Sequence, residues 1–174
     1  MRSSRIAAAA AALLLSIAAF AGCAASPGDV TATPTPMFAS DEEAFAAAEA
    51  TYRAYLDEVN RNRESSGADP QAFLVGRALE ADIAGVRKLK SAGIHVVGPS
   101  ALHSFAPQTR ASGLAAETMT AVVCLDASQA IVVDAAGQDV TPPERQAIAA
   151  FDVVFVVAGS ALLISESNTS TATC

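Results

Sequence analysis

Few side chains in this chain could carry acid–base chemistry. The candidates are Tyr52, Tyr55, Asp82, His95, His103 and Asp126. Asp, His and Tyr act as general acids or bases when burial and neighbouring charges shift their pKa values. No two of these residues stand at a recognisable catalytic spacing, so the sequence favours tyrosines in the core and histidines at strand edges or in loops. A helix tyrosine facing a strand histidine is the functional alternative.

The sequence also lacks the usual patterns of metal, phosphate and hydrolase sites. His95 and His103 have no cysteine cluster nearby, and their spacing matches no zinc or haem pattern. Gly159-Ser160-Ala161 lacks the G-x-S-x-G turn of serine hydrolases, and no glycine-rich phosphate loop is present. Asp126 is expected to end a strand and to accept a hydrogen bond from a nearby backbone N–H. We therefore assign no catalytic, metal-binding or cofactor-binding residue.

The first 23 residues have the pattern of an export signal. Arg2 and Arg5 precede an apolar run over residues 6–20, which is the order found in secretory leaders. This run is shorter than the roughly 20 residues that a membrane-spanning helix needs. A leader over residues 1–22 is the prediction.

The end of this leader resembles the lipobox of bacterial lipoproteins. Phe20-Ala21-Gly22-Cys23 has the small residues and the cysteine of that motif, with Phe20 where leucine is usual. The resemblance implies cleavage before Cys23 and attachment of diacylglycerol to its thiol. Two acyl chains anchor a protein stably, whereas one binds only marginally. The prediction is a domain held at the extracytoplasmic face of the cell membrane, and an ordinary cleavable signal is the alternative.

Charge and composition limit the other partners. The chain has 11 Lys and Arg against 18 Asp and Glu, for a net charge of −7, and loss of Arg2 and Arg5 would make it more acidic. Nucleic-acid affinity comes largely from neutralising phosphates, so no nucleic-acid partner is expected. Residues 23–39 are rich in Pro, Thr and Ala without an apolar period, which predicts a flexible tether after the lipidated cysteine.

The remaining residues, 40–174, are predicted to form one α+β domain that begins with helices. Ser40 and Glu43 have the spacing of a capping box. Behind it, apolar residues recur at helical spacing at Phe45, Ala48, Tyr52, Tyr55, Leu56 and Val59. This helix should end near Arg63.

A second helical stretch is expected to start at Asp69-Pro70 and to be broken at Gly76. It should continue with an apolar stripe at Leu79, Ile83, Val86 and Leu89 and stop at Gly93.

Strand patterns replace helix patterns after Gly93. Strands are predicted over residues 94–97, 101–105, 118–126, 130–134, 147–157 and 161–165. Turns are expected at 134–137 and 158–160. Two helices followed by a run of antiparallel strands indicate the α+β class.

Several of these segments together resemble the nuclear transport factor 2-like superfamily, in particular its bacterial lipoprotein members. They are residues 44–60, 73–92, 122–126 and 133–137 and the closing strands to Cys174. The resemblance implies a strongly curved antiparallel sheet wrapped around N-terminal helices, with a cone-shaped cavity between them. Tyr52, Tyr55, His95 and Asp126 are then the candidates for lining that cavity.

Three cysteines remain to be assigned in an exported chain. With Cys23 lipidated, Cys124 and Cys174 are left as a pair, and a disulfide can persist outside the cytoplasm. The alternative is a free, buried Cys124 followed by a disordered polar tail over residues 166–173.

The superfamily includes isomerases, dehydratases, cyclases and proteins without known activity, so the fold does not carry the function. We expect a non-enzymatic protein that binds a small apolar ligand or a protein partner. The alternative is a ketosteroid-isomerase-like enzyme acting on a hydrophobic substrate. An open cavity with a buried carboxylate or His–Asp pair would favour the enzyme. A space filled by apolar side chains would favour a partner-binding or structural role.

Overall fold

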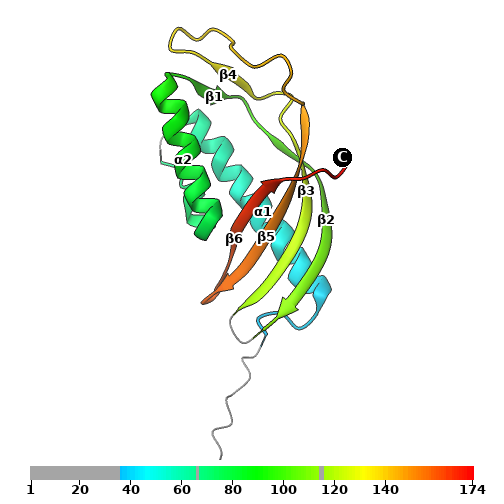
Figure 1. The fold of residues 1–174 in the computed structure, drawn as a ribbon. Coiled ribbons are helices and arrows are strands. Elements are labelled where there is room, and N and C mark those ends of the chain that lie inside the picture. The colour runs from blue at the N-terminus through cyan, green and yellow to red at the C-terminus, as the bar shows by residue number, and fades with distance from the viewer. Residues whose placement is uncertain (1–35, 66, 114–115) are drawn as a thin grey trace, which may run out of the picture. The chain divides into compact units, whose positions relative to one another are not determined.

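The computed structural model describes residues 36–65, 67–113 and 116–174; the predicted leader, Cys23 and most of the predicted tether lie outside this part. The elements are α1 (Asp41–Glu64), the 3-10 helix η1 (Pro70–Phe73), α2 (Gly76–Ala92), β1 (His95–Val97), β2 (Ala101–Ser112), β3 (Glu117–Asp126), β4 (Ile131–Val133), β5 (Ile148–Ala158) and β6 (Ala161–Thr169). Antiparallel strands form a four-stranded sheet in the order β2-β3-β5-β6, and β1 pairs separately with β4 (Figure 1). The predicted α+β class is confirmed.

Helix α1 begins where the capping box predicts. The Glu43 N–H donates to Ser40 Oγ over 3.2 Å, and the Glu43 carboxylate accepts from the Ala39 N–H over 2.9 Å. The first bond satisfies a backbone donor of the first helical turn that would otherwise have no partner, and the second joins Glu43 to the residue before the cap.

Between η1 and α2, the chain leaves the helical conformation and contacts the sheet. The Val75 N–H donates to the Ile164 carbonyl over 2.9 Å, and Leu74 forms a bridge with Ile164 of β6. Gly76, expected as the break, is the first residue of α2 and has a φ of +56°. Gly93 ends the helix in the left-handed conformation, as predicted.

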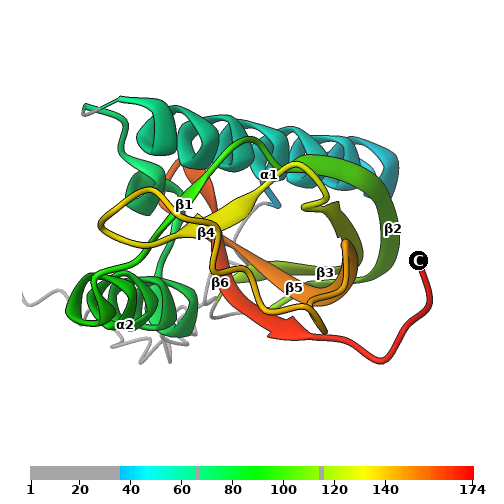
Figure 2. The ribbon, with the colours of Figure 1, turned by 90° about the horizontal axis from the view of Figure 1, so that it is seen from above.

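Of the apolar stripe expected along α2, only its first residue, Leu79, packs against the core. Ile83 is 37% exposed and Val86 is 52% exposed, whereas Ala78 near the start of the helix is buried. Helix α2 packs against β6 at the edge of the sheet (Figure 2). Val86 and Leu89 border a cavity instead of the core.

Strands β2 and β6 run further than the sequence pattern indicates. The expected ends were residues 105 and 165, whereas the strands end at Ser112 and Thr169. Both are edge strands, with one side unpaired within the sheet, and their distal halves are polar. Apolar alternation therefore does not mark these halves, and backbone pairing with β3 and β5 extends the strands.

The hydrophobic core lies between α1 and the four-stranded sheet (Figures 1 and 2). Side chains of the core that are at most 4% exposed are Ala44, Ala48 and Tyr52 of α1 and Met119, Ala121, Val123, Val153, Phe155 and Ile164 of the sheet. The sheet is open, with β2 and β6 as separate edges. Side chains thus fill the central part of the space where a cone-shaped cavity was expected.

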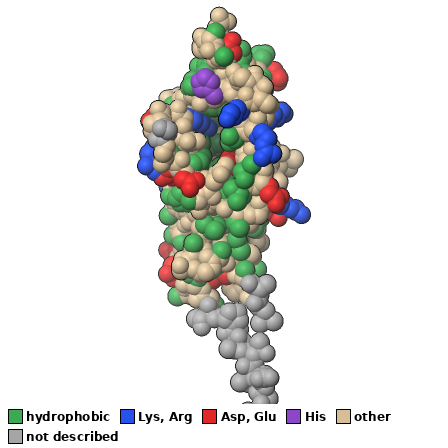
Figure 3. Space-filling model, turned by 90° about the vertical axis from the view of Figure 1, so that its left-hand side faces the viewer, with side chains coloured by type: hydrophobic (Ala, Val, Ile, Leu, Met, Phe, Trp, Pro, Cys, Tyr) green, Lys and Arg blue, Asp and Glu red, His purple; other side chains and the backbone are tan. Residues whose placement is uncertain are grey.

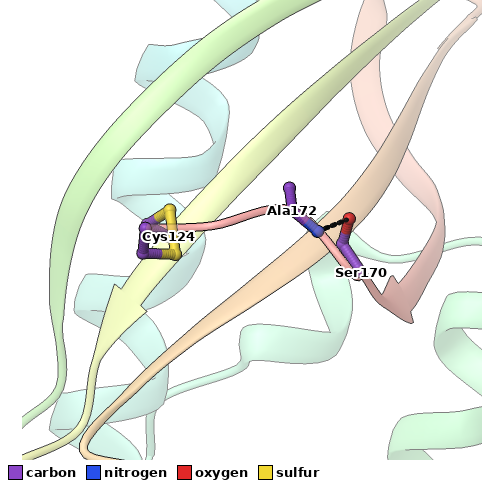
Figure 4. Close-up of a disulfide and its surroundings, with 4 residues drawn as sticks. Cys124, Ser170 and Ala172 are labelled. Carbon is purple, nitrogen blue, oxygen red and sulfur yellow. Dashed lines mark hydrogen bonds between the residues drawn. A yellow bond between two sulfur atoms is a disulfide. The ribbon is translucent and has the colours of Figure 1, made fainter.

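A disulfide joins Cys124 of β3 to Cys174, as predicted. Its Cα atoms are 5.8 Å apart, and the bond closes a loop of 50 residues. After β6, the chain passes Ser170 and Ala172 on its way back to Cys124 (Figure 4). The Ser170 N–H donates to the Ala150 carbonyl over 2.9 Å, which holds this segment on β5.

A second tie holds the start of the domain. Arg110 of β2 and Glu117 of β3 form an ion pair with side chains only 10% and 6% exposed. The Met37 N–H donates to Glu117 Oε2 over 2.8 Å, and Arg110 Nη2 donates to the Phe38 carbonyl over 2.8 Å. Arg110 Nη1 also binds Asp41 Oδ1 at 2.9 Å. Among the described residues, hydrogen bonds from the N-terminal segment to the sheet begin at Met37.

Candidate functional site

A cavity of about 750 Å³ lies beyond the core at the C-terminal end of α1. Residues of α1, η1, α2 and β1 line it. Its apolar lining includes Val59, Val86, Leu89 and Ile94, and its polar lining includes Asn62, Arg63, Asp69, Gln71, Asp82, Lys90 and His95. Figure 3, viewed from the α2 side, shows a hollow with hydrophobic side chains inside and Lys and Arg side chains at its margin.

The wall at the end of α1 is held by a two-way amide contact. Asn60 Nδ2 donates to the Ser100 carbonyl over 2.8 Å, and its Oδ1 accepts from the Ser100 N–H over 3.0 Å. Ser100 is 5% exposed, so this contact satisfies a buried backbone. It fixes the segment between β1 and β2 against the helix.

Arg63 uses the same segment as its support. Its Nη1 donates to the Gly98 carbonyl over 3.0 Å and to Ser100 Oγ over 2.9 Å. The side chain is half-buried on the cavity wall, and this burial lowers the pKa of its guanidinium. Its Nε and Nη2 atoms make no hydrogen bond to another described residue.

Arg63 differs in this respect from Arg110. Arg110 is bonded to two carboxylates, those of Asp41 and Glu117, which raise its pKa. In the described residues, no carboxylate oxygen lies within 4.0 Å of a side-chain nitrogen of Arg63. A half-buried guanidinium with free N–H groups in a cavity is suited to an anionic group of a ligand.

Helix α2 and the turn after it form another wall. Asp82 is half-buried and accepts a hydrogen bond from Gln71 Nε2 of η1 over 2.9 Å. At the end of the helix, the Ile94 N–H donates to the Leu89 carbonyl and the Gly93 N–H to the Lys90 carbonyl. This cap turns the chain so that Ile94 and His95 border the cavity.

A smaller cavity of about 140 Å³ lies beside Tyr52 and Tyr55 and is also lined by Asp82. The two phenol rings meet edge to face with centroids 5.8 Å apart. Burial, followed by the negative charge of Asp82, raises the pKa of Tyr55 to about 12, while Arg63 acts in the opposite direction. Burial and then the proximity of Tyr55 raise the pKa of Tyr52 further. Both phenols are therefore neutral at physiological pH.

The structure does not gather the four candidate residues into one site. Tyr52 and Tyr55 border the smaller cavity, and His95 borders the larger one. Asp126 borders neither; it ends β3 and accepts a hydrogen bond from the Ser128 N–H over 2.8 Å, as the sequence predicts. This bond lowers the pKa of Asp126. The tyrosine–histidine pairing across one cavity, which was the functional alternative, is not among the described contacts.

Sequence reasoning missed Arg63 and Asn60 as site residues. The signal was present, because Arg63 follows Tyr52, Leu56 and Val59 at helical spacing and so continues the apolar side of α1. A cation on the apolar side of a helix needs either a hydrogen-bonding partner or contact with solvent, because burying an unpaired charge is costly. The Ser100 contact depends on tertiary structure and has no comparable local signal.

Comparisons with protein-family models, curated proteins and solved structures found no match to this chain. Within the described ranges, no cluster of three His, Cys, Asp or Glu residues could hold a metal ion. In the same ranges, no helix combines the length and apolarity that a membrane span requires.

Proposed function

We propose that the chain is a bacterial lipoprotein, anchored by diacylglycerol on Cys23 to the extracytoplasmic face of the cell membrane, and that its domain binds a small, largely apolar ligand without catalysis. The observation that carries the binding function is the cavity beyond the core. Its volume of about 750 Å³ falls within the range of small-molecule sites. Its apolar side chains include Val59 of α1, Val86 and Leu89 of α2, and Ile94 in the turn after α2.

The exposure of Val86 supports this proposal. The side chain is 52% exposed although it borders a concave surface. An apolar ligand covering Val86, Leu89 and Val59 would remove this surface from water, at about 25 cal/mol for each Å² buried. The proposal favours a binding protein over an enzyme because Asp82 and His95, which both border this cavity, form no hydrogen bond with each other among the described contacts, and the Asp82 carboxylate is bonded to Gln71 instead.

The proposed fold is a variant of the nuclear transport factor 2-like domain. Two helices that precede an antiparallel sheet, with α1 on one face of it, support this assignment. In this variant, side chains fill the central space and the ligand site is displaced to the far end of α1.

Binding can be tested with N-phenyl-1-naphthylamine, a neutral dye that fluoresces more strongly in apolar surroundings. The mature protein from residue 23, carrying Cys23→Ser, has neither acyl chains nor the apolar leader, either of which would bind the dye. Its fluorescence signal should saturate with dye, and Val86→Glu should abolish this saturation. Val140→Glu is the matched control, because Val140 is also exposed, at 45%, but lines neither described cavity. Absence of saturable binding, or equal loss in both variants, would contradict the proposal.

Anchoring requires a separate test. Cys23→Ser should release the protein from membranes or leave the leader uncut, because the thiol that accepts diacylglycerol is gone. Cell fractionation with detection of the protein measures this. A variant that stays as fully attached and as fully processed as the unchanged chain would exclude lipidation at Cys23.

A further inference from the structure

The large cavity contains fixed charges of both signs. Arg63 and Lys90 are its cations, and Asp69 and Asp82 are its carboxylates. None of the ion pairs found in residues 36–65, 67–113 and 116–174 joins any two of these four groups. The site therefore does not neutralise itself by internal pairing.

The two half-buried charges lie on the two helices that border the cavity. Arg63 is at the end of α1, held by Gly98 and Ser100, and Asp82 is on α2, held by Gln71. Both act on the Tyr55 phenol with opposite effects on its pKa, yet no nitrogen of Arg63 lies within 4.0 Å of an Asp82 carboxylate oxygen. The two charges are thus near one another but separate.

Apolar side chains line the same cavity as these charges. Val59 precedes Arg63 by one helical turn, and Val86 follows Asp82 by one turn. Leu89 and Ile94 add further apolar surface. A ligand that satisfies all these groups must carry an anion and a cation on an apolar body.

From this arrangement we infer that the ligand is a small zwitterion with an apolar body, of the class of short peptides with free termini and aliphatic side chains. The inference rests on the proposed binding function and specifies its ligand. Arg63 binds the carboxylate through its free Nε and Nη2 donors, in the two-bond geometry that guanidinium groups favour. Asp82 accepts hydrogen bonds from the ammonium group. Lys90 and Asp69 are exposed and contribute longer-range attraction.

Three dipeptides with one apolar body test this inference by isothermal titration calorimetry on the Cys23→Ser chain. Leu-Leu is the zwitterion, N-acetyl-Leu-Leu carries only the anion, and Leu-Leu amide carries only the cation. Leu-Leu should bind about tenfold or more tightly than either capped form, because each capped form leaves one half-buried charge of the site without a partner.

Two variants assign the charges to the ligand termini. Arg63→Met should weaken binding of Leu-Leu and N-acetyl-Leu-Leu and leave Leu-Leu amide unchanged. Asp82→Asn should weaken binding of Leu-Leu and Leu-Leu amide and leave N-acetyl-Leu-Leu unchanged. If Arg63→Met melts at a much lower temperature, Lys90→Met gives a second, smaller test of the anion site, because Lys90 is exposed and has no described ion pair.

The outcomes separate this inference from the binding function itself. Capped and free dipeptides of equal affinity would overturn the inference, and so would a failure of all three to bind while N-phenyl-1-naphthylamine still binds. In both cases the apolar binding function would stand. Failure of the dye and of all dipeptides would overturn both. The crossed pattern of losses in the two variants is the result that supports the zwitterion.

Discussion

Tyr52 and Tyr55 are the only tyrosines in a chain that has no tryptophan, so phenolate absorbance reports on this pair alone. Their rings are in contact and lie next to Asp82, with Tyr52 only 4% exposed. Burial opposes formation of a phenolate, and a nearby carboxylate opposes it further. The two phenols therefore stay protonated, and their rings pack in and against the core instead of serving as bases.

This gives a prediction about alkaline pH. The folded protein keeps both phenols protonated above the usual tyrosine pKa of 10.0, with the pKa of Tyr55 at about 12. Between these values the unfolded chain binds fewer protons than the folded one, so the free energy of unfolding falls as pH rises. The slope is at most about 1.4 kcal/mol per pH unit for each tyrosine.

Phenolate absorbance measures this ionisation, and circular dichroism shows whether the protein is still folded. The same titration in denaturant should show ionisation near the ordinary pKa. Half-formed phenolate near pH 10 in the folded protein would contradict the burial of the pair.

At the residue scale, the sequence predicts local interactions better than it predicts the site. The Ser40–Glu43 cap and the Asp126 bond to Ser128 join residues three and two positions apart, so the sequence alone can indicate them. Arg63 meets Gly98 and Ser100, which are 35 and 37 residues away. Such contacts depend on how the elements pack, so residue type and spacing do not specify them.

At the scale of elements, the sequence predicts helix α2 but does not predict how much of its apolar side is buried. Its period and its end at Gly93 follow from local sequence. Periodicity shows which side of a helix is apolar, but not whether a neighbouring element covers it. Here β6 covers the Ala78 side of α2, and the side with Val86 borders the cavity.

The connection between β1 and β2 supports the cavity wall, and Gly98 is its critical position. Gly98 has a φ of +81°, and an added Cβ would lie 2.2 Å from the Gln129 carbonyl oxygen. Gly137 has a similar φ of +79° with nothing within 4 Å of such a Cβ. Left-handed backbone alone costs a non-glycine residue about 1–2 kcal/mol.

We predict that Gly98→Ala lowers the free energy of unfolding by more than Gly137→Ala does. Gly137→Ala should cost only the strain of the left-handed backbone, whereas Gly98→Ala also forces a clash with Gln129. Gly98→Ala should also weaken dye binding, because the Gly98 carbonyl supports Arg63. Chemical denaturation and the dye titration measure the two effects. Equal destabilisation by the two substitutions would show that the Gln129 backbone moves away without cost.

At the scale of the whole molecule, two long-range ties hold the ends of the domain. The Cys124–Cys174 bond fixes the C-terminal segment across β5 onto β3 (Figure 4). The Arg110–Glu117 pair fixes the N-terminal segment to the opposite edge of the sheet, at β2 and β3. Both lie away from the cavity, so their loss should reduce stability before it changes binding.

The Cys124–Cys174 disulfide allows the size of its contribution to the free energy of unfolding to be predicted. Closing a loop of 50 residues stabilises the folded state by roughly 4 kcal/mol in the chain-entropy account. The double variant Cys124→Ala/Cys174→Ala should lose about this much in chemical denaturation, whereas Cys23→Ser alone should lose none of it. Peptide mapping of the unreduced exported protein should recover the linked pair. Two free, alkylatable thiols in that protein would exclude the bond.

The N-terminal tie predicts where the domain begins. The capping box alone places the start of the domain at Ser40. However, the Glu117 carboxylate accepts a hydrogen bond from the Met37 N–H, and Arg110 donates one to the Phe38 carbonyl. Phe38 also packs against the core. A chain starting at Ser40 would lose all of these contacts and leave a nearly buried ion pair with fewer hydrogen bonds.

A chain starting at Met37 should therefore melt within a few degrees of the full mature protein, whereas one starting at Ser40 should melt at a clearly lower temperature. Arg53→Met is the control for loss of an ion pair as such, because the Arg53–Glu49 pair is exposed and worth about 0.2–1 kcal/mol at most. Limited proteolysis of the mature protein tests the same boundary without truncation. Its first cuts should fall between residues 24 and 36, because the backbone from Met37 onward is bonded to the sheet. Equal melting of the two shortened chains, or a first cut within α1, would overturn this boundary.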